Sequence, residues 1–198
     1  MGGGSRRLGR DKALVEWRGE TLLSRAVGVL REAVAEVVVV GGREGVHGFT
    51  GSPVLADERP GLGPLGGLET ALHYAVGRPV LLLACDLPRV SAGLIGLLVE
   101  TARRQGGDSA TAWVPRVDDA LQPLCALYSA GVAEPLASFL AAGRRRAHGF
   151  AAAIDATIVD VPRGNVLYSP ELFANINSAT DLAELEADDP RPPRLGDE

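Results

Sequence analysis

Residues 78–90 of the chain read RPVLLLACDLPRV, and this stretch decides the fold class. The apolar run from Val80 to Ala84 predicts a buried strand, which ends at Asp86. Strands that are apolar on both faces belong to sheets covered on both sides, the usual situation of parallel strands. The stretch therefore predicts an inner strand of an α/β protein, with a carboxylate at its carboxyl end.

The segments on either side alternate between helical periodicity and short apolar runs. Ser91 and Ser178 stand where helix N-caps are expected, and Asp181 follows Ser178 as in a capping box. Helices are predicted at 21–33, 66–77, 92–104, 130–142 and 178–186, and strands at 36–42, 52–57, 78–86, 109–115, 124–130 and 157–161. This alternation predicts a Rossmann-like, doubly wound α/β fold with a mostly parallel sheet and helices on both faces.

The length of 198 residues fits one domain, expected at residues 1–187, and the proline- and charge-rich residues 188–198 predict a disordered tail. No apolar run approaches the length of a membrane span, and the formal net charge of −5 argues against broad nucleic-acid binding. The Arg6–Arg7 pair resembles an export signal, but charged residues between Asp11 and Glu20 occupy the place of its apolar segment. A cytoplasmic location is therefore expected.

Ligands of α/β sheets bind at the carboxyl ends of strands, so the loops that follow predicted strands are candidate sites. The loop ADERPGLGPLGG at 56–67 holds Asp57 and Arg59 and is long for a mere connection, although an exposed, turn-rich connection is the alternative. Asp86 is well placed for a magnesium ion shared with phosphates. A turn aspartate before a proline is equally consistent with that short motif.

The chain opens with MGGGSRRLGRDKAL, which combines glycines, whose backbone no side chain covers, with positively charged residues. The N–H groups of Gly2, Gly3 and Gly4, together with Arg7 and Lys12, suit a chain of phosphates. The Lys-Ser/Thr pair of a Walker loop is missing, and no G-x-G-x-x-G fingerprint occurs. By itself the segment is also consistent with a flexible basic N-terminus.

Other reactive side chains carry weaker signals. Cys85 and Cys125 have no short metal-ligand spacing and are expected to be buried, reduced thiols. The three histidines match no catalytic signature. The arginine cluster 144–146 is expected to be a solvated surface, with contact to an anionic acceptor as the alternative.

Taken in order, the motifs resemble those of the molybdenum cofactor guanylyltransferases, within the Rossmann-like nucleotidyltransferases. GGGSRRLGRDK at 2–12 is similar to the signature Gly-Gly-x-Ser-x-Arg-Met-Gly-x-Asp-Lys, with leucine in place of methionine. DERPGLGPLGG at 57–67, CDLP at 85–88 and NINS at 175–178 resemble three further motifs of that family. The resemblance extends from Gly2 to about Glu186.

The resemblance implies transfer of GMP from GTP to molybdopterin, with Mg²⁺ as cofactor and pyrophosphate as the second product. It also implies transient contact with molybdenum-insertion proteins or molybdoenzyme chaperones. By this resemblance, the backbone of Gly2, Gly3 and Gly4 contacts the triphosphate, and Arg7 and Lys12 neutralise its charge. Asp86 binds magnesium, and Asp57 binds the nucleoside. Asn175 and Asn177 approach the acceptor or the metal. For the two asparagines, a purely structural role at a turn and helix start is equally consistent with the sequence.

Two other classes of function remain open at this point. One is a sister enzyme of the same fold, a molybdopterin cytidylyltransferase or a sugar-phosphate nucleotidyltransferase. Relatives often have asparagine at the nucleoside-contacting position where this chain has Gly41 and Gly42, so a polar contact there would come from backbone. The other class is a truncated nucleotide- or partner-binding protein without turnover.

The opening loop of the family follows a buried apolar strand, whereas here Met1 stands directly before Gly2. The first strand is therefore expected to be missing from this sequence. Its place in the sheet would be between the strands at 37–40 and 80–84. We accordingly expect a gap between those two strands, and a native protein that begins with about five to ten further residues.

Overall fold

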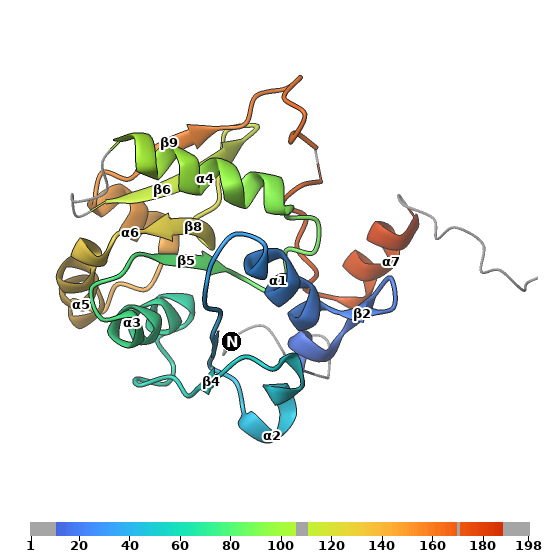
Figure 1. Ribbon diagram of the computed structural model, residues 1–198, viewed down its shortest axis with the longest axis horizontal. Coiled ribbons are helices and arrows are strands. Elements are labelled where there is room, and N and C mark those ends of the chain that lie inside the picture. Colours follow the sequence, from blue (N-terminus) through green and yellow to red (C-terminus); the bar gives the residue numbers. More distant parts are fainter. Residues whose placement is uncertain (1–10, 106–110, 170, 188–198) are drawn as a thin grey trace, which may run out of the picture.

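The computed structural model describes residues 11–105, 111–169 and 171–187, and it shows a central sheet with helices on both faces (Figure 1). Gly2, Gly3, Gly4 and Arg7 lie outside the described residues, as does the predicted tail. The longest helix described has 14 residues, and none described combines the length and apolar character of a membrane span.

The main sheet consists of β5 (Val80–Leu83), β8 (Cys125–Tyr128), β6 (Ala112–Val117) and β7 (Ala120–Leu121), in that order, with β9 (Thr157–Asp160) paired to β6. β6 and β9 are parallel, whereas β8 is antiparallel to both of its neighbours, β5 and β6. The α/β fold class is confirmed, but the sheet is mixed where the sequence predicted a mostly parallel one.

The short connection between β6 and β8 explains the antiparallel strand. It runs only from residue 118 to 124, and a parallel pairing needs a crossover of about a dozen residues or more. The chain instead turns back at Asp118 and Asp119, which both have positive φ, and β7 pairs antiparallel with the end of β6. β5, β6 and β9 still run in one common direction, so their carboxyl ends share one edge of the sheet.

Helices cover both faces of this sheet, and the strands β6 and β8 are buried on both. The prediction that β5 is a buried inner strand is wrong for the described sheet: β5 is its edge strand, and its four residues are only partly buried. One face of the sheet packs on α3 (Pro64–Ala75), α5 (Ala133–Ala141) and α6 (Ala147–Ala153) through core residues that include Val114 and Tyr128. Trp113 and Leu127 point to the other face, against α4 (Ala92–Gln105). This alternation is the two-residue period of a strand, and it explains why these strands are apolar at successive positions.

The remaining elements are η1 (Lys12–Leu14), β1 (Glu16–Trp17), β2 (Glu20–Thr21), α1 (Leu22–Arg31), β3 (Val39–Val40), α2 (Glu44–His47), η2 (Gly48–Thr50), β4 (Val54–Leu55), η3 (Ala130–Val132) and α7 (Ala179–Ala187). Each predicted helix and strand has a counterpart, with shorter strands than expected. The predicted caps are present: the Leu94 N–H donates to Ser91 Oγ at 3.3 Å, and the Asp181 N–H donates to Ser178 Oγ at 3.1 Å. The β1–β2 hairpin, α2, β7 and α6 were not predicted.

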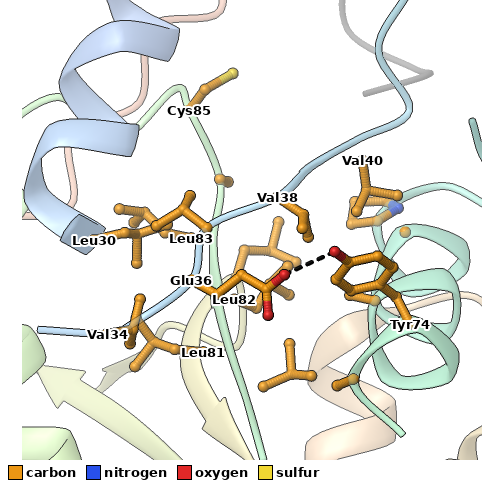
Figure 2. Close-up of a pocket in the computed structure, with 18 of the residues that line it drawn as sticks. Leu30, Val34, Glu36, Val38, Val40, Tyr74, Leu81, Leu82, Leu83 and Cys85 are labelled. Carbon is orange, nitrogen blue, oxygen red and sulfur yellow. Dashed lines mark hydrogen bonds between the residues drawn. The ribbon is translucent and has the colours of Figure 1, made fainter. Parts of the chain in front are cut away.

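The expected gap lies beside β5. β3 pairs with β4 in a separate two-stranded parallel sheet, and among the described residues no strand joins β3 to β5. A cavity of about 680 Å³ occupies this position (Figure 2). Its lining is largely apolar and includes Val38 and Val40, the strand β5, Leu30 and Val34 near or on α1, and Tyr74 of α3. The strands β3 and β5 therefore flank the cavity, and its walls toward α1 and toward α3 are both largely apolar.

Candidate active site

A cluster of three polar side chains lies at the carboxyl end of β5. The ammonium group of Lys12 donates to Asp86 Oδ2 at 2.6 Å and to Asn177 Oδ1 at 2.7 Å. The Lys12 and Asp86 side chains are only 12% and 20% exposed. Three predicted site residues, far apart in the chain, thus meet at one end of the cavity, whose lining they share.

Local structure on two sides fixes this cluster. Lys12 begins η1, whose N-cap is Asp11, and the next residue, Ala13, is fully buried. The Ile176 N–H donates to the backbone oxygen of Asp86 at 3.1 Å, and the Ile176 side chain is also fully buried. Ala13 and Ile176 are buried and lie next to Lys12 and Asn177 in the chain. Their packing therefore holds the Lys12 and Asn177 side chains at the end of β5.

The Asp86 carboxylate has the properties expected of a magnesium ligand. Its Oδ1 atom is buried and has no hydrogen-bond partner, an unusual condition for a carboxylate oxygen. No group of three or more carboxylate, histidine or cysteine side chains suited to a metal occurs among the described residues. A Mg²⁺ ion held by Asp86 would complete its shell with phosphate oxygens and water, as this ion commonly does.

Asp57 lies at the end of β4, next to the first turn of α3. Its Oδ1 is also buried without a hydrogen-bond partner. The position that a Cβ atom on Gly67 would occupy is 3.9 Å from this oxygen, so the glycine-rich turn lies directly against the carboxylate. Gly61 and Gly63 have φ values of +86° and +68°, a region that favours glycine.

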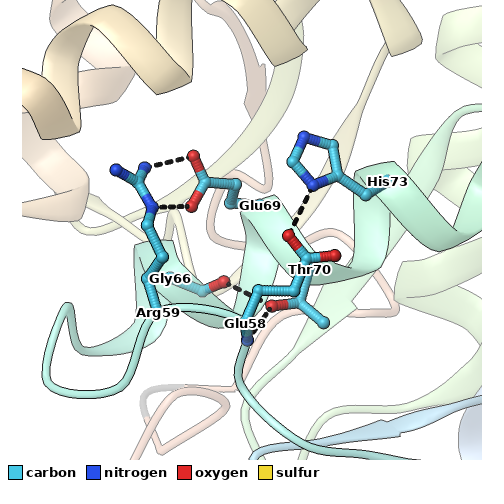
Figure 3. A network of polar contacts seen from close by, with 6 residues as sticks. All are labelled: Glu58, Arg59, Gly66, Glu69, Thr70 and His73. Atoms are coloured by element: carbon cyan, nitrogen blue, oxygen red, sulfur yellow. Dashed lines mark hydrogen bonds and ion pairs between the residues drawn. The ribbon is translucent and has the colours of Figure 1, made fainter.

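Polar contacts fasten the loop 57–63 to α3 (Figure 3). Arg59 forms a two-pronged ion pair with Glu69, with 2.8 Å between Nε and Oε2, and Glu69 is only 4% exposed. The Glu58 N–H donates to Thr70 Oγ1 at 3.1 Å. His73 contacts the Glu58 carboxylate from the next turn of α3. These contacts tie the loop after β4 to α3, although residues 58–61 are exposed.

Other candidates lie outside the cluster. Asn175 is exposed and makes no hydrogen bond to Lys12 or Asp86 within the described part of the chain. The arginines 144–146 are exposed, as expected, although Arg145 donates to the Gly61 backbone oxygen at 3.2 Å. Asp11, which belongs to the opening motif, forms a pair beside Lys12 with His47, which no sequence motif indicated.

Cys125 is buried, as expected, whereas Cys85, next to Asp86, is only partly buried and lines the cavity. Burial, and to a lesser extent the Asp86 carboxylate, raise the pKa of the Cys85 thiol to about 12, and burial alone does the same for Cys125. Since the thiolate is the reactive form, we expect iodoacetamide to alkylate both cysteines at least about tenfold more slowly than free cysteine. Mass spectrometry of the intact protein over time measures this rate. Alkylation of Cys85 at the rate of free cysteine would contradict the expectation.

A family model described as the MobA-like NTP transferase domain matches residues 1–157, which include Lys12, Asp57 and Asp86. The chain belongs to the MobA-like NTP transferase family. Curated relatives also match most of the chain. The probable molybdenum cofactor guanylyltransferase of Pelotomaculum thermopropionicum is 35% identical over 92% of this chain and 87% of its own. That of Opitutus terrae is 39% identical over 77% of this chain and 75% of its own.

Solved structures of MobA-like and related proteins share the fold. Molybdopterin-guanine dinucleotide biosynthesis protein A from Archaeoglobus fulgidus superimposes with a TM-score of 0.71 over 94% of both chains, at 23% identity. The 2-C-methyl-D-erythritol 4-phosphate cytidylyltransferase from Thermus thermophilus gives 0.65 over 89% of this chain and 92% of its own, at 22% identity. The nucleotidyltransferase fold predicted from the motifs is therefore confirmed.

Proposed function

We propose that this MobA-like protein transfers GMP from GTP to molybdopterin and releases pyrophosphate. The observation that carries the proposal is the contact of Lys12, Asp86 and Asn177 at the carboxyl end of β5. An ammonium group beside a carboxylate with an unsatisfied buried oxygen suits a triphosphate together with a divalent cation. The names of the curated relatives support the guanylyl donor and the molybdenum cofactor as acceptor.

In the proposed reaction, a terminal phosphate oxygen of molybdopterin attacks the α-phosphorus of GTP. One phosphorus–oxygen bond forms, and the bond from the α-phosphorus to the α,β-bridging oxygen breaks, so that its electron pair leaves with pyrophosphate. The protein's task in such chemistry is to position the reactants and to neutralise charge. Bound Mg²⁺ would polarise the phosphate oxygens, and Asp86 would hold it.

Lys12 would exchange its contact with Asp86 for the β- and γ-phosphates when GTP binds. Its charge would then offset the charge that develops on the pyrophosphate leaving group. Gly2, Gly3, Gly4 and Arg7, which precede Lys12 in the same motif, are proposed to contact the triphosphate as well. Asp57 is proposed to bind the nucleoside, and Asn175 and Asn177 are proposed to act on the acceptor or metal side.

A magnesium-dependent pyrophosphate-release assay tests the proposed function. Molybdopterin is incubated with the protein and with GTP, CTP, ATP or UTP in separate reactions. Release with GTP alone is expected. Release with CTP alone would favour the cytidylyltransferase alternative, and nucleotide binding without release would favour a binding protein without turnover. The cytoplasmic location and transient contacts with molybdenum-insertion proteins or molybdoenzyme chaperones remain part of this proposal.

Replacing Lys12 by alanine is expected to weaken the binding of GTP more than that of GMP. A charge-assisted contact contributes about 1.5–3 kcal/mol, which corresponds to roughly ten- to 150-fold in affinity. GMP lacks the β- and γ-phosphates, so its affinity should change far less. Titration calorimetry with both nucleotides measures the difference. Equal weakening of the two would place Lys12 away from the triphosphate.

A further inference from the structure

A buried histidine lies behind the loop that presents Lys12. His47, in the last turn of α2, is 2% exposed. Its Nε2 atom is 3.0 Å from Asp11 Oδ2, and the Arg43 N–H donates to its Nδ1 at 2.9 Å. The ring therefore links the segment after β3 to the residue immediately before Lys12.

The contacts of the ring place a proton on Nε2. Nδ1 accepts the Arg43 N–H at 2.9 Å and also lies 3.2 Å from the Arg43 backbone oxygen. Because a carboxylate can only accept, Nε2 donates to Asp11 Oδ2 at 3.0 Å. Gly42 makes room for this arrangement, since a Cβ atom there would lie 3.1 Å from His47 Nδ1 and 2.9 Å from a methyl carbon of Val54. The Arg43 backbone contacts one edge of the ring and so orients the Nε2–H on the other edge toward Asp11.

Asp11 connects this donor to the position of Lys12. Its Oδ2 accepts from His47, while its Oδ1 accepts from the Ala13 N–H at 3.1 Å, the capping contact of η1. Lys12 lies between Asp11 and Ala13, and its ammonium group reaches across to Asp86. Adjacent residues therefore attach to two different strand ends: Asp11 to the segment after β3, and Lys12 to the end of β5.

We propose that His47 is a positioning residue that sets the place of the Lys12 ammonium group by holding the Asp11 cap. In this role His47 touches no substrate and acts only through Asp11. The inference concerns the alignment of Lys12 with Asp86, and its importance for triphosphate binding rests on the proposed function. If His47 only filled space, the position of Lys12 would depend on the volume of the side chain. In the proposed role it depends on the Nε2–H that His47 donates to Asp11.

A pair of substitutions separates these roles. The amide of glutamine can donate from near the place of Nε2, so His47→Gln keeps the donor to Asp11. The shorter asparagine can accept near the place of Nδ1, so His47→Asn keeps the contact to Arg43 and loses that donor. His148→Asn is the matched control, because His148 is exposed, contacts the Leu121 backbone oxygen and lies far from η1 in the chain.

The chain offers a readout that needs no substrate, because Lys12 is the only lysine in the sequence. Protein labelled with ¹³C at lysine Cε gives a single lysine signal in NMR spectra. We expect His47→Asn to move this signal in the direction seen for Asp86→Asn, and His47→Gln and His148→Asn to leave it near its place in the unaltered protein. Equal movement in the asparagine and glutamine variants, or none in either, would overturn the proposal. Melting temperatures recorded for each variant show that the comparison is made on folded protein.

GTP affinity supplies the second readout. His47→Asn is expected to weaken GTP binding about tenfold, as the loss of a buried charge-assisted donor does, and His47→Gln by less than about threefold. On a Lys12→Ala background, His47→Asn should add less than about twofold, since coupled residues are not additive. A full additional loss on that background would overturn the proposal. If unaltered protein failed to bind GTP, the proposed function would fall, and the lysine signal would still decide the role of His47.

Discussion

Pyrophosphate release by Asp86→Asn is expected to fall at least about 100-fold, with the fold retained. The substitution removes the negative charge that would hold Mg²⁺ and that now pairs with Lys12 at 2.6 Å. It keeps the size of the side chain and leaves the backbone contact from Ile176 to the Asp86 oxygen untouched. The rate is measured with GTP and molybdopterin across a series of magnesium concentrations, and circular dichroism follows the melting temperature.

Asp160→Asn is the matched control for this change. Asp160 ends β9 and pairs with Arg116 on the exposed surface, with 2.6 Å between Arg116 Nε and Asp160 Oδ1. Since exposed pairs contribute little, this variant should keep both its rate and its melting temperature. If Asp86→Asn turned over at a near-normal rate in magnesium, Asp86 would have no part in the reaction.

An apolar strand of about six residues placed ahead of Met1 is expected to raise the melting temperature by about 5–10 °C. The reason is the cavity of about 680 Å³ between β3 and β5, with apolar walls from α1 and α3. Each large apolar side chain buried there contributes about 1.5–3 kcal/mol, and ordering each residue costs about 1–2 kcal/mol. Hydrogen bonds to both flanking strands add to the balance, which leaves a net gain of a few kcal/mol.

Two control extensions show whether the gain comes from this cavity. A Gly-Ser extension of equal length should leave the melting temperature unchanged, because it buries no apolar surface. An extension that alternates valine with lysine should gain much less than the fully apolar one, because walls on both sides of the cavity are apolar. A rise common to all three, or absent from all three, would show that the added strand does not enter the space beside β5.

Local patterns in the sequence located most elements correctly. Apolar residues at helical spacing predicted α1, and Ser178 with Asp181 predicted the start of α7, because caps and amphipathic faces depend on residues three or four apart. The β1–β2 hairpin was not predicted from the sequence. Its turn residues Arg18 and Gly19 have the two positive φ values, 55° and 79°, that are typical of a tight hairpin turn. Its strands are only two residues long, too short for an alternating pattern to be detected.

By itself the sequence determined the α/β class and the order of the motifs, and it placed Lys12, Asp86, Asn175 and Asn177 among the candidate site residues. Only the tertiary structure decided that β8 runs antiparallel beside β5, that Asn177 rather than Asn175 reaches Lys12, and that His47 supports Asp11. The reason is physical. Periodicity and capping act between near neighbours in the chain, whereas the contacts of Lys12 join residues 74 and 165 positions apart. Such contacts form only once the ends of distant strands have been brought to one edge of the sheet.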